Sequence, residues 1–289
     1  MLLLFVLRGD SPIMPIRNSP FRWPGAKDAE ADRIVELLPD HRLYVEVFGG
    51  SAAVLFTKER SGMEVYNDIN GDLVNFMRVL RDSPDALLKW LWHTPFSREI
   101  YENTATRWYK HNERPTDSVA RAGEFFFLRY ANFGGKSDQK AGFGIGRKKD
   151  NAQDYQTARE DLETFSDRIS GVHVERLDWL ELIEKYDCED AVFYLDPPYP
   201  GTEYVYGDDI SFDLDDLTPL NDLEGDWIVS AGEVATEVLD AEHSETKQKY
   251  RDLGSGENLG AKDSIERLWC SFDPRSSAFR PNMESATDW

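Results

Sequence analysis

Short apolar runs alternate with segments of helical periodicity along most of the chain. The strand-like runs, rich in Val, Tyr and Phe, are residues 43–48, 64–67, 172–177, 191–195 and 227–231. Helices are expected after the first two runs, at residues 52–60, with Ser51 as the cap, and at residues 72–81. Strands that alternate with helices predict an α/β domain with a largely parallel central sheet.

The pattern changes between residues 83 and 165. Apolar positions there follow helical spacing over residues 85–93, 97–111 and 118–132, and no strand followed by a crossover helix is visible. Residues 133–149 are rich in Gly and basic side chains, which predicts a long hairpin or loop. We therefore expect residues 83–165 to be an inserted, mainly helical domain.

The remaining chain would form the sheet domain from two separate segments, residues 14–82 and 166–289. Residues 1–13 are interpreted as a disordered or artefactual extension, because Met14 offers an alternative start. Their apolar stretch, residues 2–7, is too short for the core of a signal peptide. No apolar run reaches the roughly 18 residues of a membrane-spanning helix.

Charge is the most unusual feature of the composition. The chain of 289 residues has 33 Lys and Arg against 54 Asp and Glu, a net charge of −21, which argues at first against a nucleic-acid partner. However, residues 107–150 hold 10 basic and 5 acidic side chains, whereas residues 196–289 hold 7 basic and 22 acidic ones. A polyanion would dock at the basic segment, and the acidic surface predicts a source that lives in concentrated salt.

Other composition features set the broad class. Two cysteines are too few for a disulfide framework and indicate an intracellular protein. The five histidines show no metal-ligand spacing with each other or with the cysteines, so no metal site is expected. Phe125, Phe126 and Phe127 are interpreted as helix core rather than as a base-stacking platform.

The sharpest chemical signal is Asp196-Pro197-Pro198-Tyr199, directly after the apolar run 191–195. Ligands bind at the carboxyl ends of strands in open α/β sheets, so this tetrapeptide should face a crevice. Two prolines make the turn stiff and extended, with carbonyls that accept hydrogen bonds. A carboxylate, a carbonyl and an aromatic ring suit a flat amine such as a nucleobase, although a plain strand-to-loop turn fits the tetrapeptide alone equally well.

Such a receptor would solve a chemical problem. The lone pair of an exocyclic base amine is delocalised into the ring, so the amine is a poor nucleophile. Two acceptors that draw its hydrogens out of plane would favour an sp³-like nitrogen, with positioning and electrostatics supplying most of the rate enhancement.

A second constellation follows the first two strands. Phe48-Gly49-Gly50 ends the first run and Asp68 follows the second, 19 residues after Gly49. This resembles dinucleotide folds, in which a glycine turn permits close ligand approach and an acid binds ribose hydroxyls. The full G-x-G-x-x-G is missing, so a cofactor without a pyrophosphate, such as S-adenosylmethionine, fits better. Taken alone, a tight turn followed by Asp68 as a helix cap is the better explanation of the pattern.

Together these pieces resemble the DNA adenine-N6 methyltransferase family, the Dam-like group. The matching motifs in this sequence are Phe21-x-Trp23-x-Gly25-x-Lys27, Tyr44-Val45-Glu46-Val47-Phe48-Gly49-Gly50, Asn67-Asp68-Ile69-Asn70, Asn132-Phe133-Gly134-Gly135-Lys136, Gly142-Phe143-Gly144, Leu177-Asp178-Trp179 and Asp196-Pro197-Pro198-Tyr199. In order and spacing they span roughly residues 18–206. Val47 replaces the family's usual proline and Ala26 a common second glycine, and neither change removes a polar contact.

The resemblance implies a Rossmann-like S-adenosylmethionine-dependent sheet with an inserted, mainly helical target-recognition domain. The residues that would bind the cofactor are Trp23, Lys27, Phe48, Gly49, Gly50, Asp68, Asp178, Trp179, Asp196 and Tyr206. The residues that would hold the flipped adenine and carry methyl transfer are Asp196, Pro197, Pro198 and Tyr199. The residues that would contact double-stranded DNA are Asn132, Gly135, Lys136, Lys140, Arg147, Lys148 and Lys149.

The expected function is transfer of a methyl group to the N6 amine of an adenine in a short DNA sequence, with base flipping. Alternatives are methylation of cytosine N4 or of an RNA base, and a catalytically inert DNA-binding relative. We further expect a cytoplasmic monomer of prokaryotic or viral origin, and a cognate restriction endonuclease is a possible partner.

Overall fold

The computed structural model describes residues 18–133, 139–144, 150–198, 212, 214–231, 238–251 and 263–276. Its helices are α1 (Ala31–Leu37), α2 (Ala53–Thr57), α3 (Gly71–Asp82), α4 (Pro84–Trp92), α5 (Arg98–Ala105), α6 (Ser118–Ala131), α7 (Asn151–Ile169) and α8 (Trp179–Tyr186), with a π-helical turn η1 (Thr106–Lys110) and a 3₁₀ segment η4 (Leu214–Asp222). Its strands are β1 (Leu43–Glu46), β2 (Met63–Asn67), β3 (His173–Glu175), β4 (Ala191–Leu195), β5 (Asp226–Ala231), β6 (His243–Arg251) and β7 (Asp263–Cys270).

All seven strands form one sheet in the order β3-β2-β1-β4-β5-β7-β6. The five strands β1 to β5 run parallel, with Val45 of β1 opposite Val65 of β2 on one side and Phe193 of β4 on the other. β7 is antiparallel to both β5 and β6. These five parallel strands are the five runs expected from the sequence, so the α/β prediction is confirmed.

Alternation along each strand divides the core into two clusters. Tyr44, Tyr66 and Tyr194 point into a large cluster shared with α1, α2 and the helices α3 to α7. Val45, Val65 and Phe193 point to the opposite face, where α8 and η4 pack. Because both faces are covered, the central strands are apolar on both sides, as parallel sheets require.

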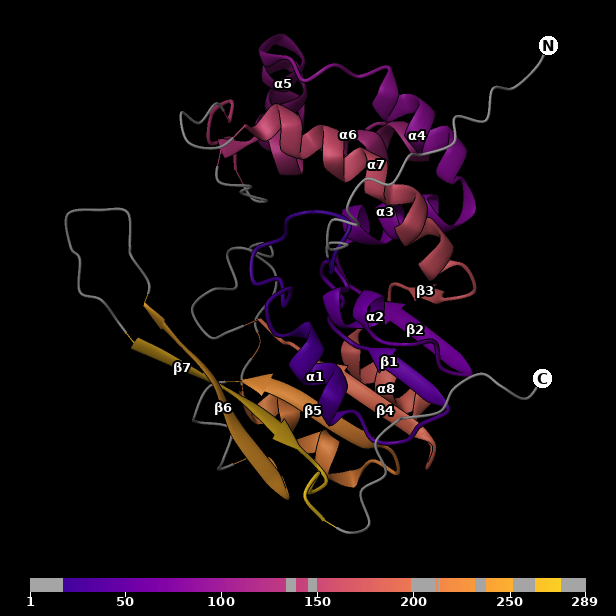
Figure 1. Ribbon diagram of the computed structural model, residues 1–289, viewed down its shortest axis with the longest axis vertical. Coiled ribbons are helices and arrows are strands. Elements are labelled where there is room, and N and C mark those ends of the chain that lie inside the picture. Colours follow the sequence, from indigo (N-terminus) through magenta and orange to yellow (C-terminus); the bar gives the residue numbers. More distant parts are fainter. Residues whose placement is uncertain are drawn as a thin grey trace, which may run out of the picture.

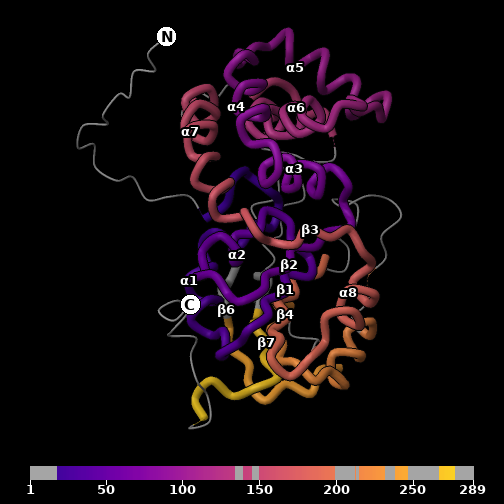
Figure 2. The backbone as a smooth tube through the Cα atoms, turned by 90° about the vertical axis from the view of Figure 1, so that its right-hand side faces the viewer, coloured from indigo at the N-terminus to yellow at the C-terminus, as the bar shows by residue number. Residues whose placement is uncertain are grey.

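The helices α3 to α7 form a separate layer beyond one edge of the sheet (Figure 1, Figure 2). α6 is buried almost all round, and its Phe125, Phe126 and Phe127 are each at most 2% exposed, which confirms their interpretation as core. α7 continues to Ile169, so the expected domain end at residue 165 falls inside a helix.

Two local expectations differ from the structure. The segment 97–111 is not one α-helix, because α5 ends at Ala105 and one π-helical turn follows. Ser51 does not cap the next helix, which is only five residues long. The residue at its cap position is Ala52, whose backbone lies in the left-handed region at φ 59°. The side chain of Ala52 accepts no hydrogen bond from the helix.

Candidate active site

A cavity of about 300 Å³ opens at the carboxyl ends of β1, β2 and β4. Its lining comes from residues 23–27, 46–51, 67–69 and 177–179, together with Ala53, Val54, Tyr194, Asp196, Pro198 and Phe212. The motifs that the sequence analysis singled out around the cofactor therefore converge on one space. The position agrees with the rule that ligands bind beyond the carboxyl ends of parallel strands.

The glycine turn after β1 is shaped by its neighbours. A Cβ on Gly49 would lie only 2.2 Å from Cε2 of Tyr66, so no larger residue fits without displacing that ring. Gly50 has φ +50°, which favours glycine. The Tyr66 hydroxyl donates to the Gly50 carbonyl at 2.9 Å. The backbone turn is thus held against β2.

Asp68 binds the same turn from the end of β2. Its carboxylate accepts hydrogen bonds from the N–H of Gly50 at 2.9 Å and of Asn70 at 2.8 Å. Burial raises the pKa of Asp68 to about 6, against the two N–H groups, which lower it. Asp68 is not the helix cap, because the Asn70 side chain accepts from the N–H groups of Asp72 and Leu73. Asp68 therefore remains at the cavity wall.

Asn67 joins three of the lining segments. Its side-chain nitrogen donates to the carbonyls of Val47 and Leu177, at 3.0 and 3.2 Å, and its oxygen accepts from the Leu177 N–H at 2.8 Å. The side chain is 2% exposed. Sequence reasoning quoted Asn67 within a motif but gave it no role, and its position as the last residue of a strand beside Asp68 was the available signal.

Aromatic residues form one wall of the cavity. Trp179 lies 6.2 Å from Phe48 and 6.0 Å from Phe212, measured between ring centroids. Asp178 precedes Trp179 and accepts from the Leu180 N–H at 2.9 Å, so it caps α8 while it lines the cavity. Rings beside carboxylates suit a ligand that combines a flat base with donor groups.

Lys27 and Asp196 meet in the cavity as an ion pair. Lys27 Nζ lies 2.6 Å from Asp196 Oδ2, and their side chains are 9% and 17% exposed. Lys27 also donates to the Gly25 carbonyl at 3.0 Å. Lys27 was expected to bind the cofactor, and Asp196 was expected to contact both the cofactor and the adenine. Their contact links the cofactor motif to the base-binding motif in space.

Glu46 is a lining residue that sequence reasoning left without a role. It is the last residue of β1, 2% exposed, and accepts from the Tyr44 hydroxyl at 3.0 Å and the Leu55 N–H at 2.8 Å. Burial raises its pKa to about 8, against those two hydrogen bonds, and the nearby charge of Asp196 raises it further. A charged residue inside the apolar run 43–48 was the sequence signal.

Two of the expected DNA-contacting residues fall in the described part of the chain. Asn132 is 1% exposed, and its amide accepts from the Tyr101 hydroxyl and the Ala141 N–H and donates to the Gln139 carbonyl. In this structure its side chain organises the loop and does not project outward. Lys140 pairs with Glu102 and donates to the Thr106 hydroxyl at 3.2 Å. Phe133, beside Asn132, is 59% exposed.

Part of the positive charge of residues 107–150 is paired with acidic side chains of the protein or is buried. Arg114 and Arg121 both bind Asp72, which lies outside that segment. Arg107 binds Glu124, which lies within it, so this pair leaves the local excess unchanged. Arg129 is 1% exposed and donates to the Tyr109 hydroxyl at 2.8 Å. The excess counted along the sequence therefore overstates the positive charge that this part of the surface presents.

The remaining expected site residues lie outside the described residues. They are Tyr199, Tyr206, Gly135, Lys136, Arg147, Lys148 and Lys149. Within the described ranges, no group of three or more His, Cys, Asp or Glu side chains could hold a metal ion. Among the helices that the structure describes, none is long and apolar enough to cross a membrane.

The sheet order and a cavity built from a glycine turn, an acid after β2 and an acid after β4 define the class of Rossmann-like methyltransferases. The family model for D12 class N6 adenine-specific DNA methyltransferases matches residues 23–216. The chain belongs to this family. The family description names both adenine and DNA, which confirms the expected function over a cytosine or RNA target.

Curated relatives agree with the family. The chain is 26% identical over 285 residues to a DNA adenine methylase of Vibrio cholerae, a match that covers 89% of this chain and 96% of the relative. It is 29% identical over 201 residues to the DNA N-6-adenine-methyltransferase of Escherichia phage P1, covering 66% of this chain but 26% of the phage protein. The type II methyltransferase M1.LlaDCHI of Lactococcus lactis subsp. cremoris is 26% identical over 194 residues, covering 64% and 66%.

Proposed function

We propose that the cavity binds S-adenosylmethionine and that its methyl group is delivered to the N6 amine of an adenine flipped out of duplex DNA at a short sequence. The observation that carries this proposal is the convergence of Gly49, Asp68 and Asp196 on one cavity. When bound, S-adenosylmethionine supplies an electrophilic methyl group on a positively charged sulfur.

The donor set fits this cofactor. Asp68 would accept the ribose hydroxyls and Asp178 the amine of the cofactor's adenine, while Phe48 and Trp179 offer ring faces to the base. Trp23, Lys27 and the backbone of Gly49 and Gly50 would hold the amino-acid portion, and Tyr206 is a further proposed contact. A cavity of about 300 Å³ with several rings and a few placed polar groups is typical of a small-molecule site.

The target amine would be held by the turn after β4. The Asp196 carboxylate and a carbonyl of the Pro197-Pro198 pair would accept its two hydrogens, and Tyr199 would stack on the base. These acceptors would favour an sp³-like nitrogen and aim its lone pair at the methyl group. The ion pair with Lys27 keeps Asp196 in place before the base arrives.

DNA contact is proposed for the basic loop that follows α6. Lys136, Lys140, Arg147, Lys148 and Lys149 would contact phosphates, with Gly135 allowing close approach. Asn132 would act by shaping this loop. We also propose a cytoplasmic monomer from a salt-rich prokaryotic or viral source, and a cognate restriction endonuclease as a partner.

The deciding variant is Asp196→Ala. We expect methyl transfer to fall by about a hundredfold to a thousandfold, the size typical of losing one preorganised electrostatic contact in an active site. Cofactor binding should stay measurable. Tritiated cofactor and a DNA substrate report transfer, and calorimetry reports binding.

Asp240→Ala removes an exposed carboxylate outside the cavity and serves as the matched control. Full methyl transfer in Asp196→Ala would exclude the proposed role of this carboxylate. Sequencing DNA from a host that expresses the gene, with detection of modified bases, would identify the target sequence.

A further inference from the structure

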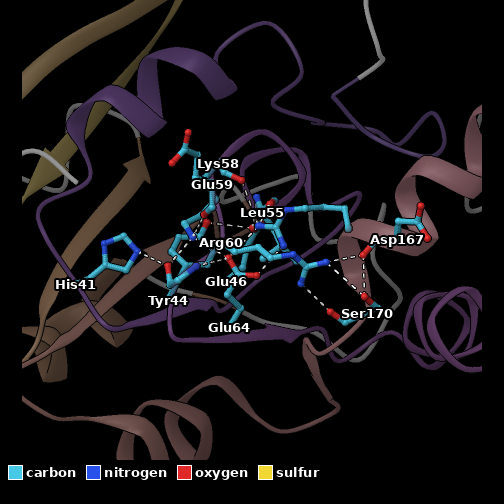
Figure 3. Close-up of polar contacts among 12 residues, drawn as sticks. His41, Tyr44, Glu46, Leu55, Lys58, Glu59, Arg60, Glu64, Asp167 and Ser170 are labelled. Carbon is cyan, nitrogen blue, oxygen red and sulfur yellow. Dashed lines mark hydrogen bonds and ion pairs between the residues drawn. The ribbon is translucent and has the colours of Figure 1, made fainter. Parts of the chain in front are cut away.

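Glu46 connects the cavity to the short helix behind it. The carboxyl group lies at the end of β1, and its Oε2 accepts both the Tyr44 hydroxyl and the Leu55 N–H (Figure 3). Leu55 is in the first turn of α2. Backbone N–H groups in a first turn have no partner within the helix, so a buried helix start needs an outside acceptor.

Glu46 supplies the acceptor that the cap residue of α2 lacks. Ala52 has no side-chain oxygen, and its left-handed backbone turns the chain abruptly into the helix. Residues 47–52 between the strand and the helix contain Gly49 and Gly50. The hydrogen bond from the Leu55 N–H to Glu46 therefore joins the two ends of the segment that contains the glycine turn, which lines the cavity.

The other end of α2 is held by α7. Arg168 donates to the carbonyls of Leu55 at 2.6 Å and Lys58 at 3.2 Å. Lys58 Nζ in turn lies 4.7 Å from the centre of the Tyr44 ring. α2 is thus held at its start by Glu46 and at its end by Arg168, and Glu46 helps to set its position relative to the cavity.

The titratable groups around Glu46 come from each neighbouring element. Tyr44 lies beside it on β1, Tyr66 on β2 and Lys58 at the end of α2. Asp196 follows β4, and its charge is offset by its ion pair with Lys27. Burial raises the pKa of Glu46 to about 8. In the ligand-free protein at neutral pH, the carboxyl group holds a proton for most of the time.

We propose that Glu46 is a positioning residue that fixes α2 beneath the cavity and gives up its proton to solvent when a cationic cofactor enters. This rests on the proposed binding of S-adenosylmethionine. A positive charge inside a cavity lined by Glu46 stabilises the carboxylate over the acid, because the interaction is poorly screened there. The hydrogen bonds from Tyr44 and Leu55 strengthen at the same time, since their acceptor becomes charged.

The inference separates two ligands that differ mainly in charge. S-adenosylmethionine has a positive sulfonium, whereas S-adenosylhomocysteine has a neutral thioether and the same amino-acid and adenosine groups. Calorimetric titration in buffers of different ionisation enthalpy counts the protons released. At pH 7 we expect about one proton released with the sulfonium ligand and far fewer with the thioether, given a pKa of about 8.

The pH of the titration excludes Asp68 as the source. Its pKa of about 6 leaves it mostly ionised at pH 7, so it has little proton to lose. Between pH 7 and pH 9 the wild-type affinity for S-adenosylmethionine should rise about tenfold more than that of Glu46→Gln. The glutamine keeps an acceptor for Leu55 but cannot ionise, and a purely structural Glu46 would not produce this difference.

Glu163→Gln on the exposed face of α7 is the matched control and should behave as the wild type. If both ligands bind but proton release is equal for them, or equal in wild type and Glu46→Gln, the inference is overturned and the proposed function stands. If neither ligand binds the wild type, the proposed function itself fails. The comparison of the two ligands uses the wild type alone, so it holds even if Glu46→Gln does not fold.

Discussion

Two carboxylates in this protein are each held between two cations, and their surroundings differ. Glu64 of β2 binds Lys58 at 2.7 Å and Arg168 at 2.6 Å, with the glutamate side chain 4% exposed. Asp72 at the start of α3 binds Arg114 at 2.9 Å and Arg121 at 2.7 Å, and is 16% exposed. The Glu64 cluster links β2 to the end of α2 and to α7. The Asp72 cluster links the start of α3 to Arg114 and Arg121.

The basic side chains of the two clusters also differ in exposure, in the same direction as the carboxylates. Lys58 and Arg168 are 1% and 16% exposed, whereas Arg114 and Arg121 are 25% and 31% exposed. A charge without its partner is costly where water cannot reach it and cheap where it can. Removal of one charge should therefore destabilise the protein strongly in the Glu64 cluster and only slightly in the Asp72 cluster.

The largest effect is expected at Glu64. Glu64→Ala leaves Lys58 and Arg168 without their carboxylate, and the free energy of unfolding should fall by about 3–5 kcal/mol, as for other broken buried ion pairs. Urea denaturation measures this loss. Glu59→Ala, at an exposed neighbouring glutamate, should change it little. A loss below about 1 kcal/mol would show that water reaches the cluster.

The dependence of stability on acidic pH tests the Glu64 cluster in a second way. Burial by itself raises the pKa of Glu64, but the hydrogen bond from Arg168 and the charge of Lys58 bring it below its ordinary value of 4.5. A carboxylate with a lowered folded-state pKa adds stability above its ordinary pKa, and this contribution disappears as the pH falls. The stability difference between wild type and Glu64→Gln should shrink below about pH 4.5.

A smaller effect is expected at Asp72. Asp72→Asn keeps a hydrogen-bond acceptor for the arginines and loses the charge, so unfolding should become easier by about 1 kcal/mol. The affinity for DNA should stay as in the wild type, because Arg114 and Arg121 serve the helical layer. Glu163→Gln controls for a lost surface charge. A marked gain in DNA affinity would mean that Asp72 withholds these arginines from phosphates.

The smallest effect on stability is expected at Lys140. Its ion pair with Glu102 joins side chains that are 36% and 44% exposed, so Lys140→Ala should change the free energy of unfolding by about 0.5 kcal/mol or less. If Lys140 contacts a phosphate, the slope of DNA affinity against salt should fall by about one. Lys185→Ala on α8, which breaks an ion pair with Glu175 of β3, is the control and should leave the slope unchanged.

The order of these effects follows burial, which the sequence shows only in outline. Short apolar runs correctly placed the parallel strands, and helical spacing correctly placed the phenylalanines of α6, because local patterns reflect which faces are covered. The sequence pattern did not predict the π-helical turn after α5, and it wrongly predicted Ser51 as the cap of the next helix. At the start of α2 the reason is tertiary, because the Leu55 N–H donates to Glu46 of β1.

The sequence by itself determined the five parallel strands, the place of Asp196 after a strand, and the glycine turn followed by Asp68. These are local patterns, since strand ends and turn residues are encoded within a few positions. Only the tertiary structure decided that Lys27 meets Asp196, that Glu46 and Arg168 clamp α2, and that Asn132 faces inward. Which charge meets which depends on how distant segments pack, and burial then sets the strength of each contact.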